Sequence, residues 1–223
     1  ANAKEKSHFY STFEKTKILT VNCNNIIGLD YEKNWAKNNL EELNFNNYQV
    51  DSFSFTNAPN LKSINGISIK PDGVGRLVLS GCSSLKYFDF SNVKELICGS
   101  FYECQELDFS NFPNSLVLHP AECAPNVTYP SDSLFRRCNK LTEVTLHISN
   151  IAGTRISATN SNLYLSAPYM FEFCTSLKKA TITLDSLENT KYTKGYGFPS
   201  MFKDCTSLEE VNIPYDRLLP ENL

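Results

Sequence analysis

The feature that constrains this chain most is a pattern that occurs three times in its second half. The copies read LFRRCNKLTEVTL at 134–146, MFEFCTSLKKATI at 170–182 and MFKDCTSLEEVNI at 201–213. Each copy has a phenylalanine, a cysteine three residues later, a leucine three residues after that, and then an aliphatic-x-aliphatic pair. Self-similarity of this kind predicts one structural unit stacked on copies of itself.

Weaker copies of the pattern precede these three, and they keep the leucine more faithfully than the cysteine. The key leucines, spaced by 21, 24, 22, 34, 36 and 31 residues, are Leu40, Leu61, Leu85, Leu107, Leu141, Leu177 and Leu208. Units of this length are typical of a solenoid. We expect the copy at Leu107 to be bulged or shortened, because Asp108 and Phe109 follow the leucine where two polar residues stand in other copies.

The repeat leaves no place for a domain boundary, so we expect one elongated domain. Residues 1–35 do not follow the pattern and are interpreted as an N-terminal cap, with about seven solenoid units in residues 36–223. Within the cap, KILTVNC alternates in the period of a strand. Aromatic cover for the first unit is expected from Phe9, Tyr10, Phe13 and Trp35.

The fold class predicted from these patterns is a repeat solenoid, mainly β with short helical turns. Each leucine is expected to begin a short strand, and strands from successive units are expected to pair in one parallel sheet of seven. The segment before the cysteine begins with proline in PSMFKDC and APYMFEFC, which favours a single helical turn. Two polar outer stretches, at 148–167 and 184–199, are expected to be loops with at most a short strand.

Alternation along the predicted strands assigns one set of side chains to the outside of the stack. An extended polar surface of this kind is where solenoids usually bind their partners. The alternative is that these residues are only the solvated side of a sheet. The candidate contact residues are Tyr87, Asp89, Glu143, Thr145, His147, Lys179, Thr181, Glu210 and Asn212.

Five of the eight cysteines occupy one position of the pattern, three residues before the key leucine. Stacked units would align their Cβ atoms one above another, which does not suit the torsion of a disulfide. We therefore expect Cys82, Cys104, Cys138, Cys174 and Cys205 to form a buried column of reduced thiols. Cys23, Cys98 and Cys123 lie outside that column, and a bridge among these three stays open.

No arrangement of residues predicts a catalytic, cofactor or metal site. His119 and Cys123 are close in sequence, but a loop histidine near a structural cysteine is the simpler interpretation. Cys98 and Cys104 lack the further ligands that zinc requires. The glycines of PDGVGR are interpreted as a turn, and the glycosylation sequon at 126–128 is short enough to arise by chance.

Charge and hydropathy exclude two classes of partner. The chain has 21 basic and 24 acidic residues, a net charge of −3, which gives no footprint for nucleic acid. No apolar run approaches the length of a transmembrane segment. ANAKEKSHFY has neither an initiator methionine nor an apolar signal segment, so we expect a mature or trimmed form.

The unit F-x-x-C-x-x-L-x-x-(aliphatic)-x-(aliphatic) resembles the BspA-type leucine-rich repeat. The match is closest in FRRCNKLTEVTL, FEFCTSLKKATI and FKDCTSLEEVNIP, where Pro214 also fits the end of the unit. The resemblance implies a right-handed solenoid with a parallel sheet on its concave side. It also implies a bacterial cell-surface or secreted protein, and it brings no catalytic residues.

These observations predict a non-enzymatic module for adhesion or protein binding, without a cofactor. The expected partner is a protein or peptide, such as host extracellular matrix or a host cell surface. Two alternatives remain: a structural spacer or stalk that presents another domain, and carbohydrate binding, which would require clustered aromatic residues on the outward row.

Overall fold

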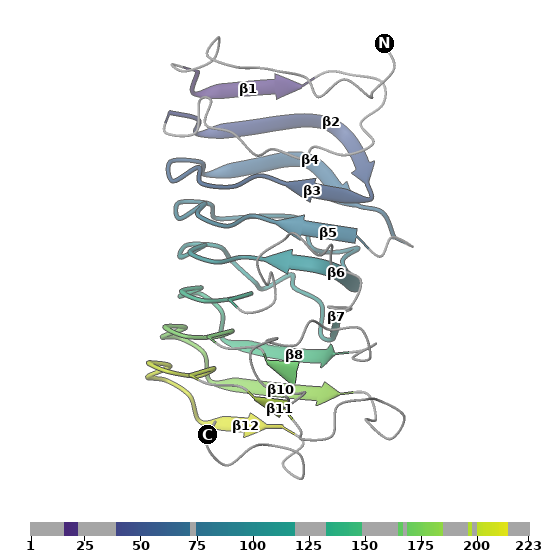
Figure 1. The fold of residues 1–223 in the computed structure, drawn as a ribbon. Helices are drawn as coiled ribbons and strands as arrows, with labels where there is room; N and C mark the ends of the chain where they lie inside the picture. Colours follow the sequence, from purple (N-terminus) through teal and green to yellow (C-terminus); the bar gives the residue numbers. More distant parts are fainter. Residues whose placement is uncertain are drawn as a thin grey trace, which may run out of the picture.

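The computed structural model describes residues 16–21, 39–71, 75–118, 133–148, 165–166, 169–184, 196–197 and 200–213. These residues form strands and turns, stacked from β1 at one end to β12 at the other (Figure 1). The strands are β1 (Ile18–Val21), β2 (Glu42–Val50), β3 (Ser52–Ser54), β4 (Ser63–Ile69), β5 (Gly75–Val78), β6 (Glu95–Ser100), β7 (Leu116–Leu118), β8 (Glu143–Ile148), β9 (Leu165–Ser166), β10 (Lys179–Leu184), β11 (Tyr196–Gly197) and β12 (Glu210–Asn212).

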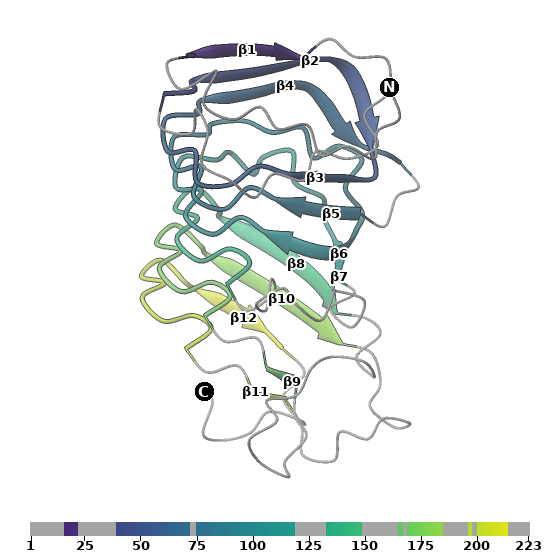
Figure 2. The same cartoon turned by 45° about the horizontal axis from the view of Figure 1, so that its top comes forward.

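All strand pairs in the described residues are parallel, and they make three sheets. One sheet has the order β1-β2-β4, the second β12-β10-β8-β7-β6-β5-β3, and the third β11-β9. Strands β8, β10 and β12 run away from a column of stacked turns, whereas β3, β5 and β6 run towards it (Figures 1 and 2). Short β7 joins the two groups, because it pairs with the end of β8 and the start of β6.

The prediction of one sheet built from seven post-leucine strands is wrong. Strands follow five of the key leucines, but after Leu85 there is only an isolated bridge between Tyr87 and Ser63, and the residues after Leu107 form turns. The five post-leucine strands are therefore divided between two sheets, with β2 and β4 beside β1 in one and β8, β10 and β12 in the other.

A second short motif explains this interruption. The sequence Asp-Phe-Ser-Asn follows both leucines, at 89–92 and 108–111. In each copy the aspartate accepts a hydrogen bond from the backbone amide of the serine two residues on, at 3.0 Å to Asp89 and 2.8 Å to Asp108. This Asx turn bends the backbone out of the strand direction, so the extended pairing stops. The departure expected at Leu107 is confirmed, and Leu85 shares it.

The helical turns expected before each cysteine are also absent from the described residues. Some amides in these turns close a single turn, as in Arg136 to the Ser133 carbonyl at 3.1 Å. Others donate to the next unit, as in Phe135 to the Met170 carbonyl and Phe171 to the Met201 carbonyl, both at 2.9 Å. The residue immediately before the cysteine position has positive φ in six successive units. Left-handed residues of this kind end right-handed helical geometry. They are Asn57, Gly81, Glu103, Arg137, Phe173 and Asp204.

The core runs through the middle of the stack as files of equivalent residues. Leu141 and Leu177 are fully buried, and Leu208 is partly buried. Beside them the ring of Phe135 stacks on Phe171 at 5.5 Å between centroids, and Phe171 stacks on Phe202 at 5.3 Å. The alignment that the repeat predicts for its leucines and phenylalanines is thus present.

The N-terminal part contains one strand of the predicted cap. Strand β1 alternates as expected, with Leu19 and Val21 packed against the core and Ile18 exposed. Further along, Gly66 stands where the aliphatic pair of its unit is broken, at a β-bulge between β2 and β4. A Cβ atom there would lie 2.1 Å from the Phe45 carbonyl oxygen, so only glycine fits. The aromatic cap residues at 9, 10, 13 and 35, and Cys23, lie outside the described residues.

Candidate functional site

The candidate site is the outward side of β8, β10 and β12, called here the strand face. Seven of the nine predicted contact residues lie on it: Glu143, Thr145, His147, Lys179, Thr181, Glu210 and Asn212. Parallel pairing places Lys179 beside both Glu143 and Glu210, and Thr181 beside Thr145 and Asn212. The side chains therefore stand in rows that run across the three strands.

Alternation on these strands is what turns the polar residues outward. Val144 and Leu146 on β8, and Ala180 and Ile182 on β10, are buried at 5% exposure or less. The intervening residues are partly or fully exposed. The face assignment made from the sequence is confirmed for β8 and β10. On β12, Glu210 and Asn212 are exposed as expected, but Val211, which stands in the inward position, is also exposed at 43%.

The charges on the strand face alternate between neighbouring strands. Lys179 Nζ lies 2.9 Å from Glu210 Oε1, and both side chains are about half exposed. The hydrogen bond to Glu210, followed by the Coulomb attraction of the same carboxylate, raises the pKa of Lys179 above its ordinary value. The row thus presents a fixed cation between two carboxylates.

A third row pairs His147 on β8 with Thr183 on β10. His147 Nδ1 lies 2.9 Å from the Thr183 hydroxyl oxygen, and that hydroxyl donates to the Leu146 carbonyl at 3.3 Å. Because the hydroxyl proton is used, Nδ1 is the donor to Thr183. The imidazole is held in one orientation at the rim of the face.

The other two predicted contact residues lie elsewhere in the stack. Tyr87 is 48% exposed and pairs with Ser63 on β4, so the unit of Leu107 separates it from β8. Asp89 holds the first Asx turn through its carboxylate. The structure therefore does not bring these two residues together with the strand face.

The buried cysteine column, which follows the stacked turns, is a ladder of hydrogen bonds. Each thiol donates to the carbonyl of the residue at the phenylalanine position in the preceding unit. Cys174 Sγ lies 2.9 Å from the Phe135 oxygen, and Cys205 Sγ lies 3.0 Å from the Phe171 oxygen. The same bond links Cys138 to Phe101 and Cys104 to Leu79.

The thiols in this column are held protonated. Desolvation by burial raises the pKa of Cys174 to about 12 and that of half-buried Cys205 to about 11. Cys104, Cys138, Cys174 and Cys205 are unbridged, and Cys82 donates to the Phe55 carbonyl, so the predicted column is confirmed. Such thiols pack and donate, but they are poor nucleophiles and metal ligands.

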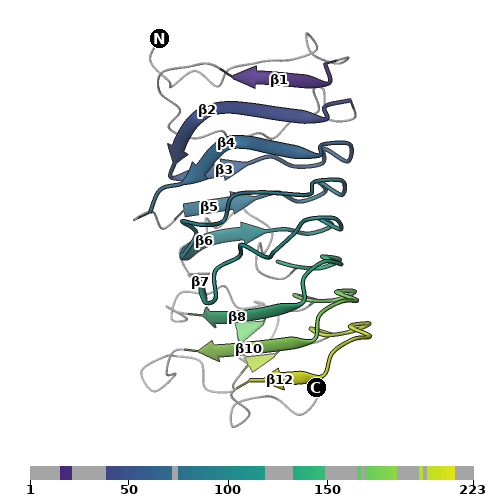
Figure 3. The same ribbon diagram turned by 180° about the vertical axis from the view of Figure 1, so that it is seen from behind.

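Sequence reasoning missed a polar network at the turns that precede the cysteines, called here the turn edge. Figure 3 shows these turns stacked along one side of the molecule. Glu172 is 2% exposed, yet it pairs with Arg136 on one side and with Lys203, at 3.1 Å, on the other. Arg136 also lies between the rings of Tyr102 and Tyr169.

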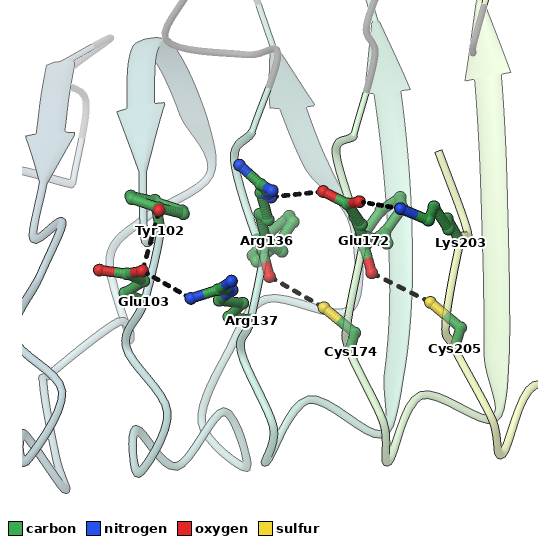
Figure 4. Close-up of polar contacts among 10 residues, drawn as sticks. Tyr102, Glu103, Arg136, Arg137, Glu172, Cys174, Lys203 and Cys205 are labelled. Atoms are coloured by element: carbon green, nitrogen blue, oxygen red, sulfur yellow. Dashed lines mark hydrogen bonds and ion pairs between the residues drawn. The ribbon is translucent and has the colours of Figure 1, made fainter. Parts of the chain in front are cut away.

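A parallel chain of contacts lies beside the first (Figure 4). Glu103 accepts hydrogen bonds from Tyr102 at 2.9 Å and from Arg137 at 3.0 Å, and Arg137 lies over the ring of Phe173. Burial, with the Glu103 hydrogen bond second, raises the pKa of Tyr102. The signal in the sequence was the pair of residues between phenylalanine and cysteine: YE, RR, EF and KD in successive units are complementary.

The described residues contain no cluster of three or more histidine, cysteine or acidic side chains suited to a metal ion. Cys104 is committed to the thiol ladder, whereas His119, Cys123 and the side chain of Cys98 lie outside the described residues. In the described part of the chain, the strand face is a surface of charged and polar side chains on paired strands.

Among the described residues, no helix has the length and apolar character needed to cross a membrane.

Comparison with protein families identifies the repeat. The model for the BspA type leucine rich repeat region matches residues 5–120, 31–192 and 121–218, with six copies. The chain belongs to this family. Comparison with curated proteins and with solved structures found no similar protein.

Membership in the BspA-type leucine-rich repeat family indicates a general class of function. Repeat domains of this family are typically protein-interaction modules and generally lack enzymatic activity. They typically belong to surface or secreted bacterial proteins.

Proposed function

We propose that this BspA-type repeat chain is a non-enzymatic binding module that acts outside the cell and holds a protein or peptide partner on its strand face. The single observation that carries the proposal is the register of β8, β10 and β12. It aligns Glu143, Lys179 and Glu210 in one row and two threonines with Asn212 in the next. The result is an ordered polar surface on rigid strands.

The shape that suits this function is a right-handed solenoid of one domain, with the post-leucine strands on its concave side. The stacked turns and the parallel pairing support that shape. A concave sheet offers area to a partner, whereas small molecules are usually held in enclosed pockets.

The charge pattern of the strand face favours a particular class of partner. Glu143 and Glu210 are separated by one strand, so their backbones are about 10 Å apart, with Lys179 between them. A complementary surface would place two basic groups at that separation around an acidic one. A polyanion would face two carboxylates for each cation, so proteins and peptides fit better than nucleic acid or sulfated glycans.

Two rival functions make different demands on the same surface. A spacer or stalk would need no contact residues, so changing the strand face would alter no binding. Carbohydrate binding would need aromatic platforms, and Tyr87 is the exposed aromatic residue on the post-leucine side of the described residues.

The test is binding of the purified chain to a panel of extracellular-matrix proteins, measured by surface plasmon resonance. The test variant reverses each charge in the row, Glu143→Lys, Lys179→Glu and Glu210→Lys. It keeps alternating charges and hence the Lys179–Glu210 pairing. The matched control reverses an exposed pair on another side, Glu106→Lys with Lys140→Glu. We expect the test variant to lose binding and the control to retain it.

Equal binding by the test variant and the control would contradict the proposed contact surface. Equal binding that disappears only when Tyr87 is replaced by alanine, with an oligosaccharide as competitor, would favour the carbohydrate alternative. Melting curves of all variants, compared with the unchanged chain, separate lost contact from lost folding.

A further inference from the structure

The two end strands of the stack each pair on one side only within the described residues. Strand β12 pairs with β10, and β1 pairs with β2, at opposite ends of the structure (Figure 1). An unpaired strand edge presents backbone donors and acceptors that can pair with another chain. A further strand could therefore be added at either end of the stack.

The two aliphatic side chains among the exposed large hydrophobic residues of the described chain lie at the same two ends. Of the four large apolar or aromatic side chains that are exposed, Val211 lies on β12 at 43% and Ile18 lies on β1 at 58%. Next to Val211, Phe202 and Ile213 are only partly buried, although their counterparts one unit earlier are at most 1% exposed. The apolar core is therefore partly exposed to solvent at the last described unit.

Strand β1 has the sequence that would continue the stack beyond β12. In the register of the repeat, Leu19 corresponds to Leu43 and Val21 to Phe45, both inward positions. The matching inward positions at the other end are Val211 and Ile213. Placed below β12, β1 would therefore set apolar residues on apolar residues and Thr20 beside Asn212.

The charges next to the strands support the same pairing. The position after the key leucine carries Lys178 and then Glu209 at the β12 end. At the β1 end the same position carries Lys17, Glu41 and Lys62. Lys17 Nζ lies 2.9 Å from Glu41 Oε1, and Lys62 Nζ lies 2.7 Å from Glu41 Oε2. Those two lysines, through hydrogen bonds first, lower the pKa of Glu41 to about 2. Joining the ends would place Glu209 against Lys17 and continue the alternation without a break.

We propose that this protein associates head to tail, with β12 of one copy pairing in parallel with β1 of a second copy. The contact joins two different surfaces and leaves one of each unused, so it propagates into open chains of copies. This interface uses the ends of the stack and does not depend on what the strand face binds.

The experiment exploits the fact that each end can be blocked separately. Val211→Lys places an inward-pointing charge on β12 and blocks the tail, whereas Leu19→Lys does the same to β1 and blocks the head. Molar mass is measured by light scattering after size-exclusion chromatography, from micromolar to near-millimolar protein. We expect the unchanged chain to form dimers and larger species as its concentration rises, and each blocked variant alone to stay monomeric.

A mixture of the two blocked variants tests whether the head of one copy binds the tail of another. The free tail of the Leu19→Lys copy can pair with the free head of the Val211→Lys copy, so the mixture should form dimers and stop there. Reversing one junction charge, Glu209→Lys, should weaken association by about two- to fivefold, the scale of an exposed ion pair. Glu106→Lys, the same change far from both ends, should have no effect.

An unchanged chain that stays monomeric at every concentration would overturn the proposal. So would association that both blocked variants retain, since it would use another surface. Melting curves establish that each variant folds, and if Leu19→Lys does not, Lys17→Glu serves as the variant on the head side. Loss of self-association with partner binding intact would leave the proposed function untouched, and the reverse result would leave this interface untouched.

Discussion

The turn edge and the strand face are built from the same repeat, yet they differ in how their polar groups are used. At the turn edge, Glu172 is almost completely buried and has two cationic partners from neighbouring units. On the strand face, Glu210 pairs with Lys179 among the described residues, and its side chain is 57% exposed. Polar side chains at the first site hold units together, whereas those at the second leave most of their surface to solvent.

This difference indicates which parts of the repeat tolerate amino-acid substitution. At the turn edge, Glu103, Arg137 and Phe173 adopt left-handed backbone conformations. The equivalent positions of two earlier units hold asparagine and glycine, Asn57 and Gly81, which adopt this conformation at a lower energetic cost. The side chains of Glu103, Arg137 and Phe173 contact one another across three units. The strand face has ordinary extended backbone, so its side chains can be exchanged without disturbing the scaffold. We expect mutations to separate the two regions by their effects on stability.

The largest effect should come from the phenylalanine file beneath the turn edge. Phe135→Ala removes a fully buried ring that stacks on Phe101 and Phe171, both at 5.5 Å. We expect the free energy of unfolding to fall by about 3–5 kcal/mol, measured by urea denaturation. The matched change on the strand face, Thr145→Ala, should stay within about 0.5 kcal/mol. Similar losses for both would remove the distinction between the regions.

The buried carboxylate gives the next largest effect. Glu172→Ala leaves Arg136 and Lys203 without their shared partner, in a site where their own side chains are 29% and 55% exposed. Breaking a fully buried pair costs about 3–5 kcal/mol, and since these cations can be hydrated we expect about 2 kcal/mol in the same assay. A loss no greater than that of Glu210→Ala would mean that the network at the turn edge adds nothing.

The thiol ladder predicts an effect of pH. Well below pH 9 the cysteines are protonated in both the folded and the unfolded protein. Between pH 9 and about 12 the unfolded chain loses thiol protons that folded Cys174, with its pKa of about 12, retains. The unfolded state then binds fewer protons, so stability falls as the pH rises, by up to about 1.4 kcal/mol per pH unit for each such thiol.

The measurement is the free energy of unfolding at a series of alkaline pH values. The variant Cys174→Ala has a precedent in the chain, since Ala58 occupies the same position in an earlier unit. It should be less stable at neutral pH by about 1–2 kcal/mol but should show a shallower decline above pH 9. Parallel curves for the variant and the unchanged chain would show that burial does not hold this thiol protonated.

Much of the scaffold could be predicted because the same buried positions recur in each unit of the repeat. The leucine file, the cysteine column and the alternation on β8 and β10 follow directly from spacing and period. The Asx turns after Leu85 and Leu107 could not be seen in that pattern, because they depend on Asp-Phe-Ser-Asn, a local hydrogen-bonding motif that competes with strand pairing. The positive φ before each cysteine position could not be predicted either, because the residue there differs in type from unit to unit.

The contact residues were predicted less evenly, for a physical reason. Period-two alternation tells which side chains point outward, so Glu143, Lys179 and Glu210 were placed in one row. It does not tell which neighbouring units keep their strands, so Tyr87 was placed in the same row although it lies beside β4. The turn-edge network was missed because its residues vary from unit to unit, and the information is in their complementarity.

The smallest expected effect belongs to the strand face. Lys179 and Glu210 are 2.9 Å apart but about half exposed, so solvent screens their attraction. Lys179→Ala should change the free energy of unfolding by less than about 1 kcal/mol, and added salt should shrink that difference further. A larger, salt-independent loss would mean that this pair holds β10 to β12, as Glu172 does at the turn edge. A small loss leaves Lys179 available to a partner, because the scaffold does not require its charge.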